Sequence, residues 1–598
     1  MYLFEKTFPI IGWLPKYSTG KLRGDIIAGL TVAVMIIPQA MGYGLLAGVP
    51  PEVALYASIV PMTLYALLGT CRELSVGPAA LISLMTAQTI HQLRPGLETG
   101  TPEWVALAIL IAILVGAVQF GLGLIRMGVL VQFLSRPVVS GFMSAAALII
   151  ASSQIKLLVG TPIPGDGFFS RLYATFQEIP QMHSPTLVLA VVCMAAMFAS
   201  RKLWKSFPMP FALVVVTTAL SWYFGFADSG IAVVGEVKAG IPIPSIPEVT
   251  YAQVSELFPN VVAIALVGFL ESISVSKTYA FQHHYDVDAN QELRAVGTAN
   301  IFGGLFGGYV VTGNISRTVV SAQAGAKTQV YALITASIVL LTVLLLAPLF
   351  ANLPKAMLAA MIVVAVIGIV DVAEASRLVR FKPHDAAGLV ITFIATLTYN
   401  VEIGILTGVV SSLILHLYQT TKPHFAILGR LPGTSHWREL ERHPEGIIED
   451  DVIVIRIDES LYFANAPSLR SVVEHAYNVH PAHPRGFVLD CMAINDLDST
   501  ALDVLQQIAD EMTLEDTQLC LAGVSAPIHD ILEKSGCLSH IGEEYLFTTV
   551  HAAVQSFGVG DPTETIYSDT TLTSVSREGV RGTPGLDPAD PDPIRDAS

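Results

Sequence analysis

Charged residues are scarce in this sequence. Of its 598 residues, 14% are Asp, Glu, Lys or Arg and 52% are hydrophobic, with a mean hydropathy of +0.59. A typical soluble domain carries about 25% charged residues. The composition therefore excludes a chain that is soluble throughout, and it predicts a polytopic membrane protein.

Cysteine is also rare, and its spacing is irregular. The cysteines show no paired spacing, which argues against a disulfide framework and a zinc site. The histidines, such as His283 and His284, show no metal-ligand spacing either. We therefore expect no metal and no cofactor. The five cysteines are Cys71, Cys193, Cys491, Cys520 and Cys537.

The motifs of common enzymes are missing as well. The sequence contains no glycine-rich phosphate loop of the Walker type and no nucleophile elbow. The chain is therefore not expected to be an enzyme. Residues 1–24 lack a cleavable signal pattern, and we expect them to form a short cytoplasmic leader.

Charge is unevenly distributed along the chain. Residues 1–430 contain 24 Lys and Arg against 20 Asp and Glu, whereas residues 431–598 contain 9 against 29. A boundary near residue 430 therefore separates an apolar, slightly basic part from an acidic, soluble part. The acidic part has no basic patch of the kind that binds nucleic acid.

The apolar part, residues 25–420, contains roughly fourteen candidate membrane segments, several of them short. Loops after even-numbered segments hold most of the basic residues. Because Lys and Arg mark the cytoplasmic side, we expect both termini in the cytoplasm and the spans in the cell membrane. The segments start near residues 25, 53, 77, 103, 128, 185, 209, 258, 292, 313, 329, 354, 384 and 401. The even-numbered loops hold Arg72, Arg126, Arg201, Lys202, Lys205, Lys277, Arg294, Lys327, Arg377, Arg380 and Lys382, against Arg94, Arg171, Lys238 and Lys355 in the odd-numbered loops.

Two regions repeat one pattern. The run "DIIAGLTVAVMIIPQAMGYG" is interrupted by Pro38 and Gln39, and "ELSVGPAALISLMTAQ" follows it. The run "NVVAIALVGFLESISVSKTY" is interrupted by Glu271, and "GYVVTGNISRTVVSAQ" follows it. Matching interrupted segments in two halves indicate a transporter with inverted repeats, here seven segments plus seven.

The first short piece predicts a broken helix. We expect Ser75 and Val76 to be extended, Gly77 to turn the chain, and Pro78 to lie in the first turn of a helix, where its missing N–H is not needed.

The second short piece also predicts a broken helix. Residues 309–312 are expected to be extended, Gly313 and Asn314 to form the turn, and a helix to start near Ile315. Such backbone persists at membrane depth only when it is buried in protein or lines a cavity. Two helix N-termini would then face one space, and their free N–H groups and partial positive charges would attract an anion.

Two charged residues lie in these segments. Arg317 follows the second helix start by one short turn, where its planar guanidinium could bind an oxyanion. It could instead extend to the membrane edge or pair with an acid. Glu271 could carry a proton, or it could be a structural partner of Arg317. Intramembrane charge costs at least about 2.5 kcal/mol, which favours the functional interpretations.

A charge count connects the two residues. Two helix ends and Arg317 provide roughly +2, which ionised Glu271 reduces to about +1. A dianion therefore fits best when Glu271 is protonated, and a monoanion could fit when it is ionised. The count predicts symport of a dianion with a proton.

Long stretches of the sequence resemble the sulfate permease (SulP) family, which includes plant and bacterial sulfate transporters and mammalian prestin-like anion exchangers. The resemblance covers about residues 8–557. It implies a fourteen-segment helical domain with a 7+7 inverted repeat, in which segments 1–4 and 8–11 form a core and segments 5–7 and 12–14 a gate. Members are usually homodimers. The stretches are "RGDIIAGLTVAVMIIPQAMGYGLLAGVPPEVALYASIVP", "FLSRPVVSGFMSAAALIIASSQIK" and "NQELRAVGTANIFGGLFGGYVVTGNISRTVVSAQAGAKTQ".

The resemblance also implies an anion site between the third and tenth segments. Ser316 and Arg317 match the family's Ser-Arg pair, and Glu271 matches the acid of the proton-coupled sulfate transporters. Gln39 and Tyr43 match polar and aromatic site residues of the first segment. The two breaks would complete the substrate site with Gly77, Pro78, Ala79, Ala80, Gly313, Asn314 and Ile315.

The soluble part alternates between strand and helix patterns, as in an α/β domain. "DESLYFANA" and "FVLDCMAINDLDSTALDVL" resemble the STAS domain, which follows the membrane domain in most family members. We expect a linker at 421–435, the STAS domain at 436–557 and a disordered acidic tail at 558–598. Ser499 or Thr500 could be phosphorylated, although a helix cap explains Ser499 better.

The sequence thus predicts a secondary transporter of inorganic anions in the lipid bilayer, with sulfate–proton symport as the first hypothesis. Bicarbonate, chloride or dicarboxylate transport by the same fold stays open. The sodium-coupled bicarbonate branch matches less well, because Glu271 and Val275 stand where its members have Asp and Thr. An anion sensor that acts through the STAS domain, or a cytoplasmic protein bound to it, is the alternative of another class. Such a sensor would be expected to lose the site charges.

Overall fold

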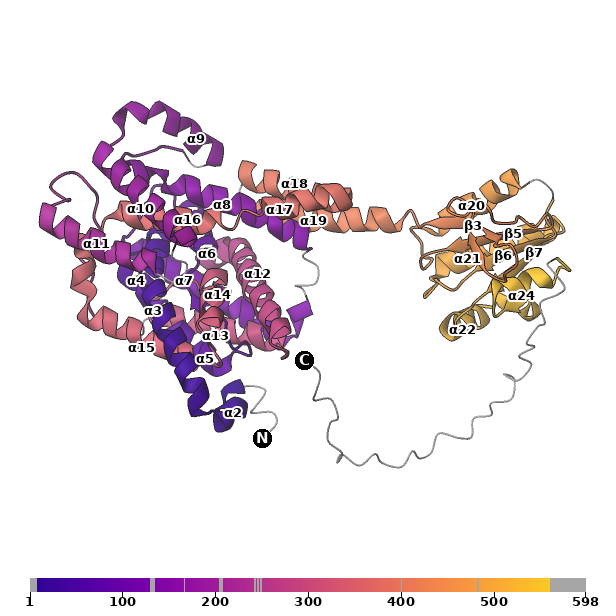
Figure 1. Cartoon of the computed structure of the whole chain (residues 1–598), viewed down its shortest axis with the longest axis horizontal. Coiled ribbons are helices and arrows are strands. Elements are labelled where there is room, and N and C mark those ends of the chain that lie inside the picture. The colour runs from indigo at the N-terminus through magenta and orange to yellow at the C-terminus, as the bar shows by residue number, and fades with distance from the viewer. Residues whose placement is uncertain are drawn as a thin grey trace. The chain divides into compact units, whose positions relative to one another are not determined.

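The computed structural model describes residues 8–129, 135–165, 167–203, 208–240, 244, 247, 250–399, 401–480 and 483–559. The chain divides into two compact units, Met1–His416 and Leu417–Ser598. Figure 1 shows both units and follows the chain by colour. Residues 1–7 of the expected leader and 560–598 of the expected tail lie outside the described residues.

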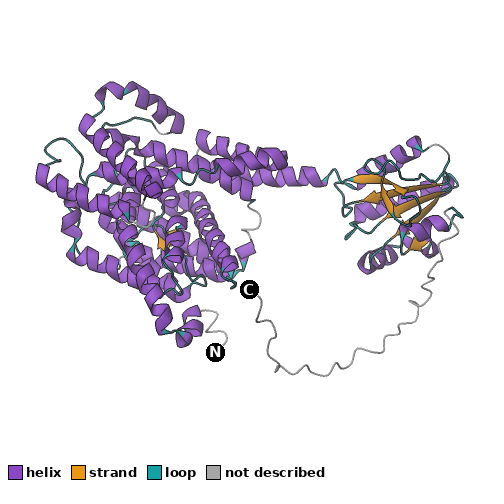
Figure 2. Cartoon of the chain, viewed as in Figure 1, coloured by secondary structure: helices purple, strands orange, loops and turns teal. Residues whose placement is uncertain are grey.

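The first unit consists of helices, which Figure 2 shows in purple. Within the described residues, helices occupy the places of all fourteen expected segments, and seven helical spans are long and apolar enough to cross a membrane. The helices are α3 (Thr19–Ala47), α4 with α5 (Pro51–Tyr56 and Val60–Leu68), α6 (Ala80–Leu93), α7 (Pro102–Leu124), α8 (Arg136–Val159), α10 (Ser184–Leu203), α11 (Met209–Phe224), α12 (Tyr251–Gln282), α13 (Ala289–Leu305), α14 (Ile315–Gln323), α15 (Val330–Leu345), α16 (Lys355–Ile367), α18 (Pro383–Thr398) and α19 (Val401–Thr420).

Some boundaries differ from the expected ones. The fifth segment begins at Arg136 and not near residue 128. The helices α3 and α12 continue through Pro38 and Glu271, so these residues interrupt the apolar pattern without breaking the helix. Short helices α2 (Pro9–Trp13), α9 (Phe168–Gln177) and α17 (Val372–Phe381) were not expected.

Two very short strands cross within the helical unit, and Figure 2 shows them in orange among the helices. Strand β1 (Val76–Gly77) precedes α6, and β2 (Thr312–Gly313) precedes α14. They pair antiparallel, with Val76 opposite Gly313 and Gly77 opposite Thr312. The two broken stretches therefore satisfy part of each other's backbone hydrogen bonding, as buried backbone in a membrane requires.

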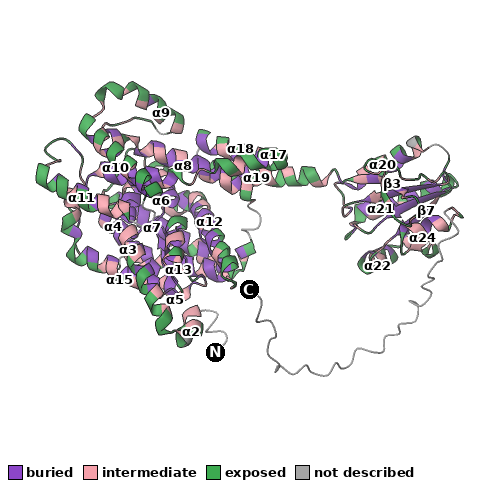
Figure 3. Cartoon of the chain, in the orientation of Figure 1, coloured by how far each residue is buried: buried purple, intermediate pink, exposed green. Residues whose placement is uncertain are grey.

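Small residues bring helices of this unit close together. Gly116 of α7 and Gly297 of α13 face each other so closely that a Cβ added to Gly297 would lie 2.5 Å from the amide nitrogen of Phe120. Small residues permit such close approach, and it is typical of helix packing in membranes. Figure 3 shows buried positions inside the unit and exposed ones along outer helices such as α9 and α19.

Helix contacts divide the unit into two groups. Helices α3 to α7 pack mainly against α12 to α15, whereas α8 packs against α16, α18 and α10. The contacts of α3 with α16 and of α6 with α8 join the two groups. Helices α6 and α8 therefore border both groups, at the place where the cavities described below lie.

The second unit is an α/β domain around one sheet with strand order β4-β3-β5-β6-β7-β8. Strands β5 to β8 run parallel, and β3 is antiparallel to both of its neighbours. The strands are β3 (Phe425–Arg430), β4 (Trp437–Glu439), β5 (Val452–Ile457), β6 (Gly486–Asp490), β7 (Gln518–Ala522) and β8 (Leu546–Phe547). Strand β3 lies inside residues 421–435, so the segment expected to be a linker contributes to the sheet.

Helices cover both faces of this sheet, each over its own apolar core. The expected helices are present as α20 (Ala466–Val479), α21 (Ser499–Leu514) and α22 (Ala526–Ser535), and α23 (Leu538–Ile541) and α24 (Val550–Gln555) complete the domain. All five cysteines of the chain are unpaired and buried.

The cap of α21 is Asp498 and not Ser499. One carboxylate oxygen of Asp498 accepts a hydrogen bond from the Ala501 amide at 2.8 Å, and the other accepts one from the Phe463 amide at 2.6 Å. Ser499 and Thr500 are the first residues of the helix, and both are exposed. Asp satisfies free N–H groups at a helix start as well as Ser does, so the sequence alone did not separate neighbouring candidates.

We expect Asp498→Ala to lower the free energy of unfolding of the second unit by about 1–2 kcal/mol, because it removes a helix cap. It also removes the contact with the loop after β5. Urea denaturation of residues 417–559 measures the change. Asp503→Ala, at an exposed position of the same helix, is the control. Equal destabilisation by both variants would contradict the role of Asp498 as the cap.

Candidate functional site

A cavity of about 1170 Å³ lies where the starts of α6 and α14 meet α3, α8 and α12. Ala80 and Leu81 of α6, and Ile315 and Ser316 of α14, line it. Tyr43, Glu271 and Asn314, which the sequence indicated, also line it. The two broken helices therefore face one space, as their sequences predicted.

The first amide groups of both short helices are available to a ligand. The Ala80, Leu81, Ile315 and Ser316 N–H groups make no hydrogen bond within the described part of the chain. The first N–H groups of a helix lack partners inside it and carry a partial positive charge. These four amides therefore give the cavity the character of an anion site.

Asn314 caps α14. Its side-chain oxygen accepts hydrogen bonds from the Arg317 amide at 3.1 Å and from the Ser316 hydroxyl at 2.8 Å. The cap stabilises the helix start and holds Ser316 beside the cavity, because an Asn oxygen accepts two donors at once.

Arg317 lies behind the cavity wall and is fully buried. Its Nη1 donates to the Pro78 carbonyl at 2.9 Å, and its Nε donates to the Ser75 hydroxyl at 3.3 Å. Its Nη2 has no hydrogen-bond partner, and no acid forms an ion pair with it within the described residues. Arg317 therefore ties α14 to the stretch before α6, and its positive charge is not cancelled by a direct contact.

Glu271 is the acid in this part of the cavity wall. It does not form an ion pair with Arg317, and its Oε2 is buried without a hydrogen-bond partner in the residues that the structure describes. The interpretation of Glu271 as a structural ion-pair partner of Arg317 is therefore not supported. Glu271 lines the cavity.

A hydroxyl network holds β2 against α12. Ser272, which follows Glu271, accepts a hydrogen bond from the Gly313 amide at 2.8 Å and lies 2.8 Å from the Thr312 hydroxyl. The Thr312 hydroxyl also donates to the Gly268 carbonyl. Of these residues, Gly313 was predicted from the sequence, and Gly268, Ser272 and the Thr312 hydroxyl were not. Hydroxyl side chains within apolar segments are the sequence signal that could have indicated this network, because buried polar groups require hydrogen-bond partners.

A second network anchors the chain before β2. Asn300 of α13 accepts from the Val311 amide at 2.7 Å and donates to the Val311 carbonyl at 2.9 Å. It also donates to Gln119 of α7 at 3.0 Å, and Gln119 donates to the Ala265 carbonyl of α12. Three helices therefore fix the extended piece, which keeps the start of α14 in place.

Two glycines permit the strands to cross. A Cβ at Gly77 would lie 3.2 Å from Arg317 Nη2. A Cβ at Gly313 would lie 2.7 Å from Leu74 Cδ1 and 3.0 Å from the Ser272 Cα. A larger residue at either position would displace the crossing or the guanidinium.

The predicted site residues fall into two sets. Lining the cavity are Tyr43, Ala80, Glu271, Asn314, Ile315 and Ser316. Outside its lining lie Gln39, Gly77, Pro78, Ala79, Gly313 and Arg317. Pro78 also differs in its role, because α6 begins at Ala80 with Ala79 as its cap, and Pro78 precedes the helix. The Pro78 carbonyl instead accepts the Arg317 hydrogen bond.

The other end of this cavity carries charges of both signs. Arg136 of α8, Lys277 of α12 and Arg377 of α17 line it together with Asp371 and Glu374. Arg377 donates to Glu374 at 2.7 Å. Three basic and two acidic side chains therefore line this end.

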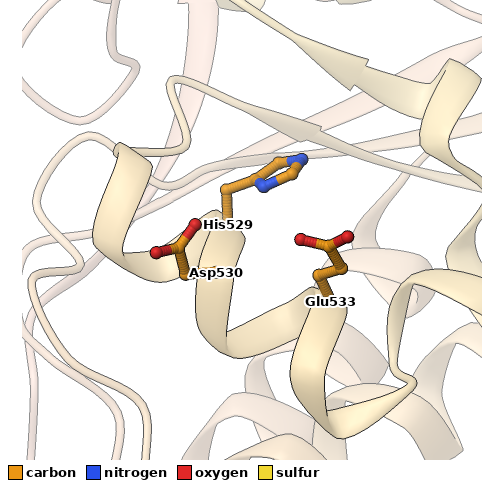
Figure 4. Close-up of side chains that lie close together, drawn as sticks. All are labelled: His529, Asp530 and Glu533. Carbon is orange, nitrogen blue, oxygen red and sulfur yellow. The ribbon is translucent and has the colours of Figure 1, made fainter. Parts of the chain in front are cut away.

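One side-chain cluster outside the cavity has the composition of a metal site. His529, Asp530 and Glu533 of α22 could each offer a ligand atom, and Figure 4 shows His529 and Glu533 on the same side of the helix. Asp530 and Glu533 are exposed. Because exposed acidic groups of this kind are common without a metal, we assign no function to the cluster.

Family models match both units of the chain. A model described as the sulfate permease family matches residues 22–394, and a model of the STAS domain matches residues 443–553. A probable sulfate transporter of Mycobacterium tuberculosis (strain ATCC 25618 / H37Rv) is 34% identical over 92% of this chain and 99% of its own length. Sulfate transporter 4.1, chloroplastic, of Arabidopsis thaliana is 34% identical over 92% of this chain and 82% of its own length.

Solved structures share the fold. The murine Slc26a9 anion transporter in the inward-facing state has a TM-score of 0.85 and 25% identity, and the match covers 94% of this chain and 95% of that one. The transmembrane domain of the cyanobacterial bicarbonate transporter BicA has a TM-score of 0.58 and 22% identity, covering 66% and 98%. The helical membrane unit followed by a STAS domain is thus a known arrangement.

We expect Gly313→Ala to destabilise the membrane unit by about 1–3 kcal/mol, the usual effect of overpacking, because its Cβ would meet Leu74 and Ser272. Thermal unfolding in detergent, with aggregation followed by size-exclusion chromatography, measures the shift. Gly121→Ala in α7 is the control, since nothing lies within 4 Å of its added Cβ. If Gly313→Ala were as stable as Gly121→Ala, the close crossing of β1 and β2 would be wrong.

Proposed function

This chain belongs to the sulfate permease family and carries a STAS domain, and from this premise we propose that it takes up sulfate together with protons. The observation that carries the proposal is the convergence of the α6 and α14 starts on one cavity, with the charge of Arg317 behind them and Glu271 in the wall. Sulfate is the substrate named for its relatives in Mycobacterium tuberculosis and Arabidopsis thaliana.

Sulfate would bind at the amide groups of the two helix starts. Each start contributes roughly half a positive charge, and the fixed charge of Arg317 adds to it in a setting of low dielectric. The Tyr43 hydroxyl offers a further donor at the cavity surface, whereas the Ser316 hydroxyl already donates to Asn314. A tetrahedral dianion can accept hydrogen bonds on several sides at once, which suits donors that come from two helices and an aromatic side chain.

Arg317 would act as a positioning and electrostatic residue and not as a direct ligand. Its two hydrogen bonds go to Pro78 and Ser75, which precede α6 in the chain. The guanidinium would therefore set the distance between the two helix starts while it supplies charge. This differs from bidentate binding of the anion by Arg317, the role that its residue type alone suggests.

Glu271 would couple transport to protons. A protonated Glu271 leaves the site with a charge of roughly +2, which matches sulfate, and ionisation lowers it to about +1. Sulfate binding and protonation of Glu271 would thus favour each other, as linkage between two binding sites requires. Release of both into the cell would follow from loss of the proton.

The cavity would face the cytoplasm in this conformation. Lys277 and Arg377, which belong to the loops expected on the cytoplasmic side, line the end away from the helix starts. We place both termini and the STAS domain on the same side, in a protein of the cell membrane that forms homodimers. The transport step would move the α3–α7 and α12–α15 group against the group of α8, α10, α16 and α18.

Bicarbonate transport is the second candidate. The BicA membrane domain shares the fold, at 22% identity. A monoanion would fit the site with Glu271 ionised, so the substrate depends on the protonation state of this residue. In the sensor alternative, the site would bind an anion without transporting it. Arg317 and Glu271 provide the charges that transport needs, which favours a transporter. Phosphorylation of Thr500 stays a prediction, which phosphopeptide mass spectrometry covering the start of α21 tests.

We expect Arg317→Ala to abolish labelled sulfate uptake into proteoliposomes and Arg317→Lys to reduce it at least about tenfold, because hydrogen bonds to charged groups contribute about 1.5–3 kcal/mol. Lysine keeps the charge but cannot reach Pro78 and Ser75 with two fixed donors. Arg380→Lys, at an exposed position, is the control. Full uptake by Arg317→Lys would show that charge alone suffices and would contradict the positioning role.

We expect an inward proton gradient to stimulate sulfate uptake by the wild-type protein and not by Glu271→Gln, because the amide cannot exchange a proton. A pH-sensitive dye inside the vesicles measures the proton flux that accompanies sulfate. Glu256→Gln, at an exposed position of the same helix, should behave as wild type. Sulfate entry without any acidification of the interior would refute proton symport, and exchange of bicarbonate or chloride without sulfate uptake would overturn the substrate.

A further inference from the structure

A second cavity, of about 490 Å³, lies at the opposite ends of the same helices. The first cavity contacts the starts of α6 and α8, whereas the second is lined by residues 84–92 of α6 and residues 152–157 of α8, near their C-terminal ends. Residues 45–48, where α3 ends, and Arg171 of α9 complete this part of the wall. Relative to the proposed sulfate site, the second cavity and α9 are therefore on the far side of the membrane unit.

The connection that contains α9 begins and ends at the same depth. The carbonyl of Val159, the last residue of α8, accepts a hydrogen bond from the His183 amide at 2.9 Å, directly before α10 begins. The Thr161 hydroxyl donates to the Gln181 carbonyl at 2.8 Å. The 24 residues of α8 span about 36 Å at 1.5 Å per residue, enough to cross a hydrocarbon layer of about 30 Å. The connection therefore starts and ends at the membrane surface.

Helix α9 is held against the membrane unit and does not project away from it. Phe168 packs against the apolar core, and Ala174 is buried. The helix contacts α8 and α18. Its 10 residues extend about 15 Å, roughly half of what a membrane span requires. Helix α9 therefore lies on the unit at the membrane surface and is too short to cross the bilayer.

The exposed residues of α9 fall on two sides of the helix. Residues three and four positions apart share one side of an α-helix. Ser170 and Gln177, seven positions apart, form an exposed polar side. The side chains of Tyr173 and Phe176 are 67% and 66% exposed, and all exposed residues of α9 are uncharged. The exposed apolar side consists of Phe169, Leu172, Tyr173 and Phe176.

The neighbouring membrane helices present the same kind of surface. Helix α10 follows α9 in the chain, α18 contacts α9, and both helices expose aliphatic side chains. An exposed apolar surface of this kind marks an interaction site, and aromatic residues are enriched where a membrane meets water. The apolar side of α9 therefore extends a lipid-facing surface to the membrane boundary. The exposed aliphatic residues are Val188, Val191 and Val192 of α10 and Val390, Ile391 and Ile394 of α18.

We propose that α9 binds the phospholipid surface, with its apolar side between the headgroups and the acyl chains and its polar side in water. An amphipathic helix at a membrane interface is buried in this way. Because all exposed residues of α9 are uncharged, a neutral phospholipid is sufficient as the partner. The bound helix would fix the depth at which α8 ends, beside the second cavity. This inference goes beyond the proposed function and is independent of which anion is transported.

Spin labels on single introduced cysteines test the proposal in vesicles of phosphatidylcholine. Tyr173→Cys and Phe176→Cys place the label on the apolar side of α9, and Ser170→Cys and Gln177→Cys place it on the polar side. The five native cysteines are buried, so the wild-type protein treated with the label gives the background. Relaxation of the label by oxygen, which concentrates in lipid, and by a polar nickel complex, which stays in water, measures its surroundings.

We expect the ratio of oxygen access to nickel access to be at least about threefold higher at the two apolar positions than at the two polar ones, because the two sides face lipid and water. Equal ratios on both sides would overturn the proposal. Low access of both reagents to the apolar positions would also overturn it, since protein would then cover the helix. Magnetic broadening between labels on two molecules would identify that protein as a second copy of this chain.

Brominated lipid provides a second measurement that needs no introduced cysteine. In phosphatidylcholine with brominated acyl chains, the fluorescence that Phe176→Trp adds to the wild-type signal should be quenched, because bromine quenches tryptophan that contacts the acyl chains. The fluorescence that Gln177→Trp adds should not be quenched, since this neighbouring position is on the polar side.

Equal quenching of the two tryptophan variants, or quenching of neither, would contradict the binding of α9 to lipid by its apolar side. Neither the spin-label measurement nor the fluorescence measurement involves sulfate. A failure of this proposal would therefore leave the proposed function standing, and a protein that transports no sulfate could still bind lipid through α9.

Discussion

The membrane unit depends on satisfying two broken stretches of backbone deep inside it. Without water, an unpaired N–H or C=O group costs several kcal/mol. The antiparallel pairing of β1 with β2, and side chains such as Asn300 and Ser272, provide these partners. Arg317 joins the same arrangement through Pro78 and Ser75. The interaction that completes the fold therefore also places a positive charge at the site.

This arrangement explains why the charge lies behind the cavity and not inside it. A guanidinium open to the cavity could bind an anion so tightly that release becomes slow. A guanidinium held by Pro78 and Ser75 would contribute through its field, and in the proposed function the anion would meet amide and hydroxyl groups. Desolvation of a charge in a protein interior costs several kcal/mol. The net contribution of Arg317 therefore depends on this desolvation cost as well as on its hydrogen bonds and on the two helix starts.

The two cavities give the transport cycle a physical basis. Helices α3, α6 and α8 contribute to both, and the layer between the cavities spans two or three residues on each helix. A small displacement of one helix group against the other could therefore open one side and close the other. Packed interfaces tend to change between discrete arrangements, so such a displacement can act as a switch.

The sequence by itself determined the class of the protein and the order of its parts. Low charge, fourteen apolar segments and the change of composition near residue 430 predicted a membrane unit followed by a soluble α/β domain. The glycines at 77 and 313 predicted the two breaks, because local backbone preferences depend on the residues in and beside the turn. Local cues were weaker at boundaries: Pro78 precedes its helix, Asp498 caps α21, and β3 lies in the expected linker.

Only the tertiary structure decided how the distant pieces meet. Arg317 contacts Pro78 and Ser75, more than two hundred residues earlier, and no local pattern indicates this pairing. The same holds for the network of Asn300 with Gln119, and for the meeting of α3, α6, α8 and α9 around a second cavity. Residue type and spacing predict which groups are able to bind an anion. Which of them face the ligand depends on long-range packing, since each contact is made by helices that are far apart in the chain.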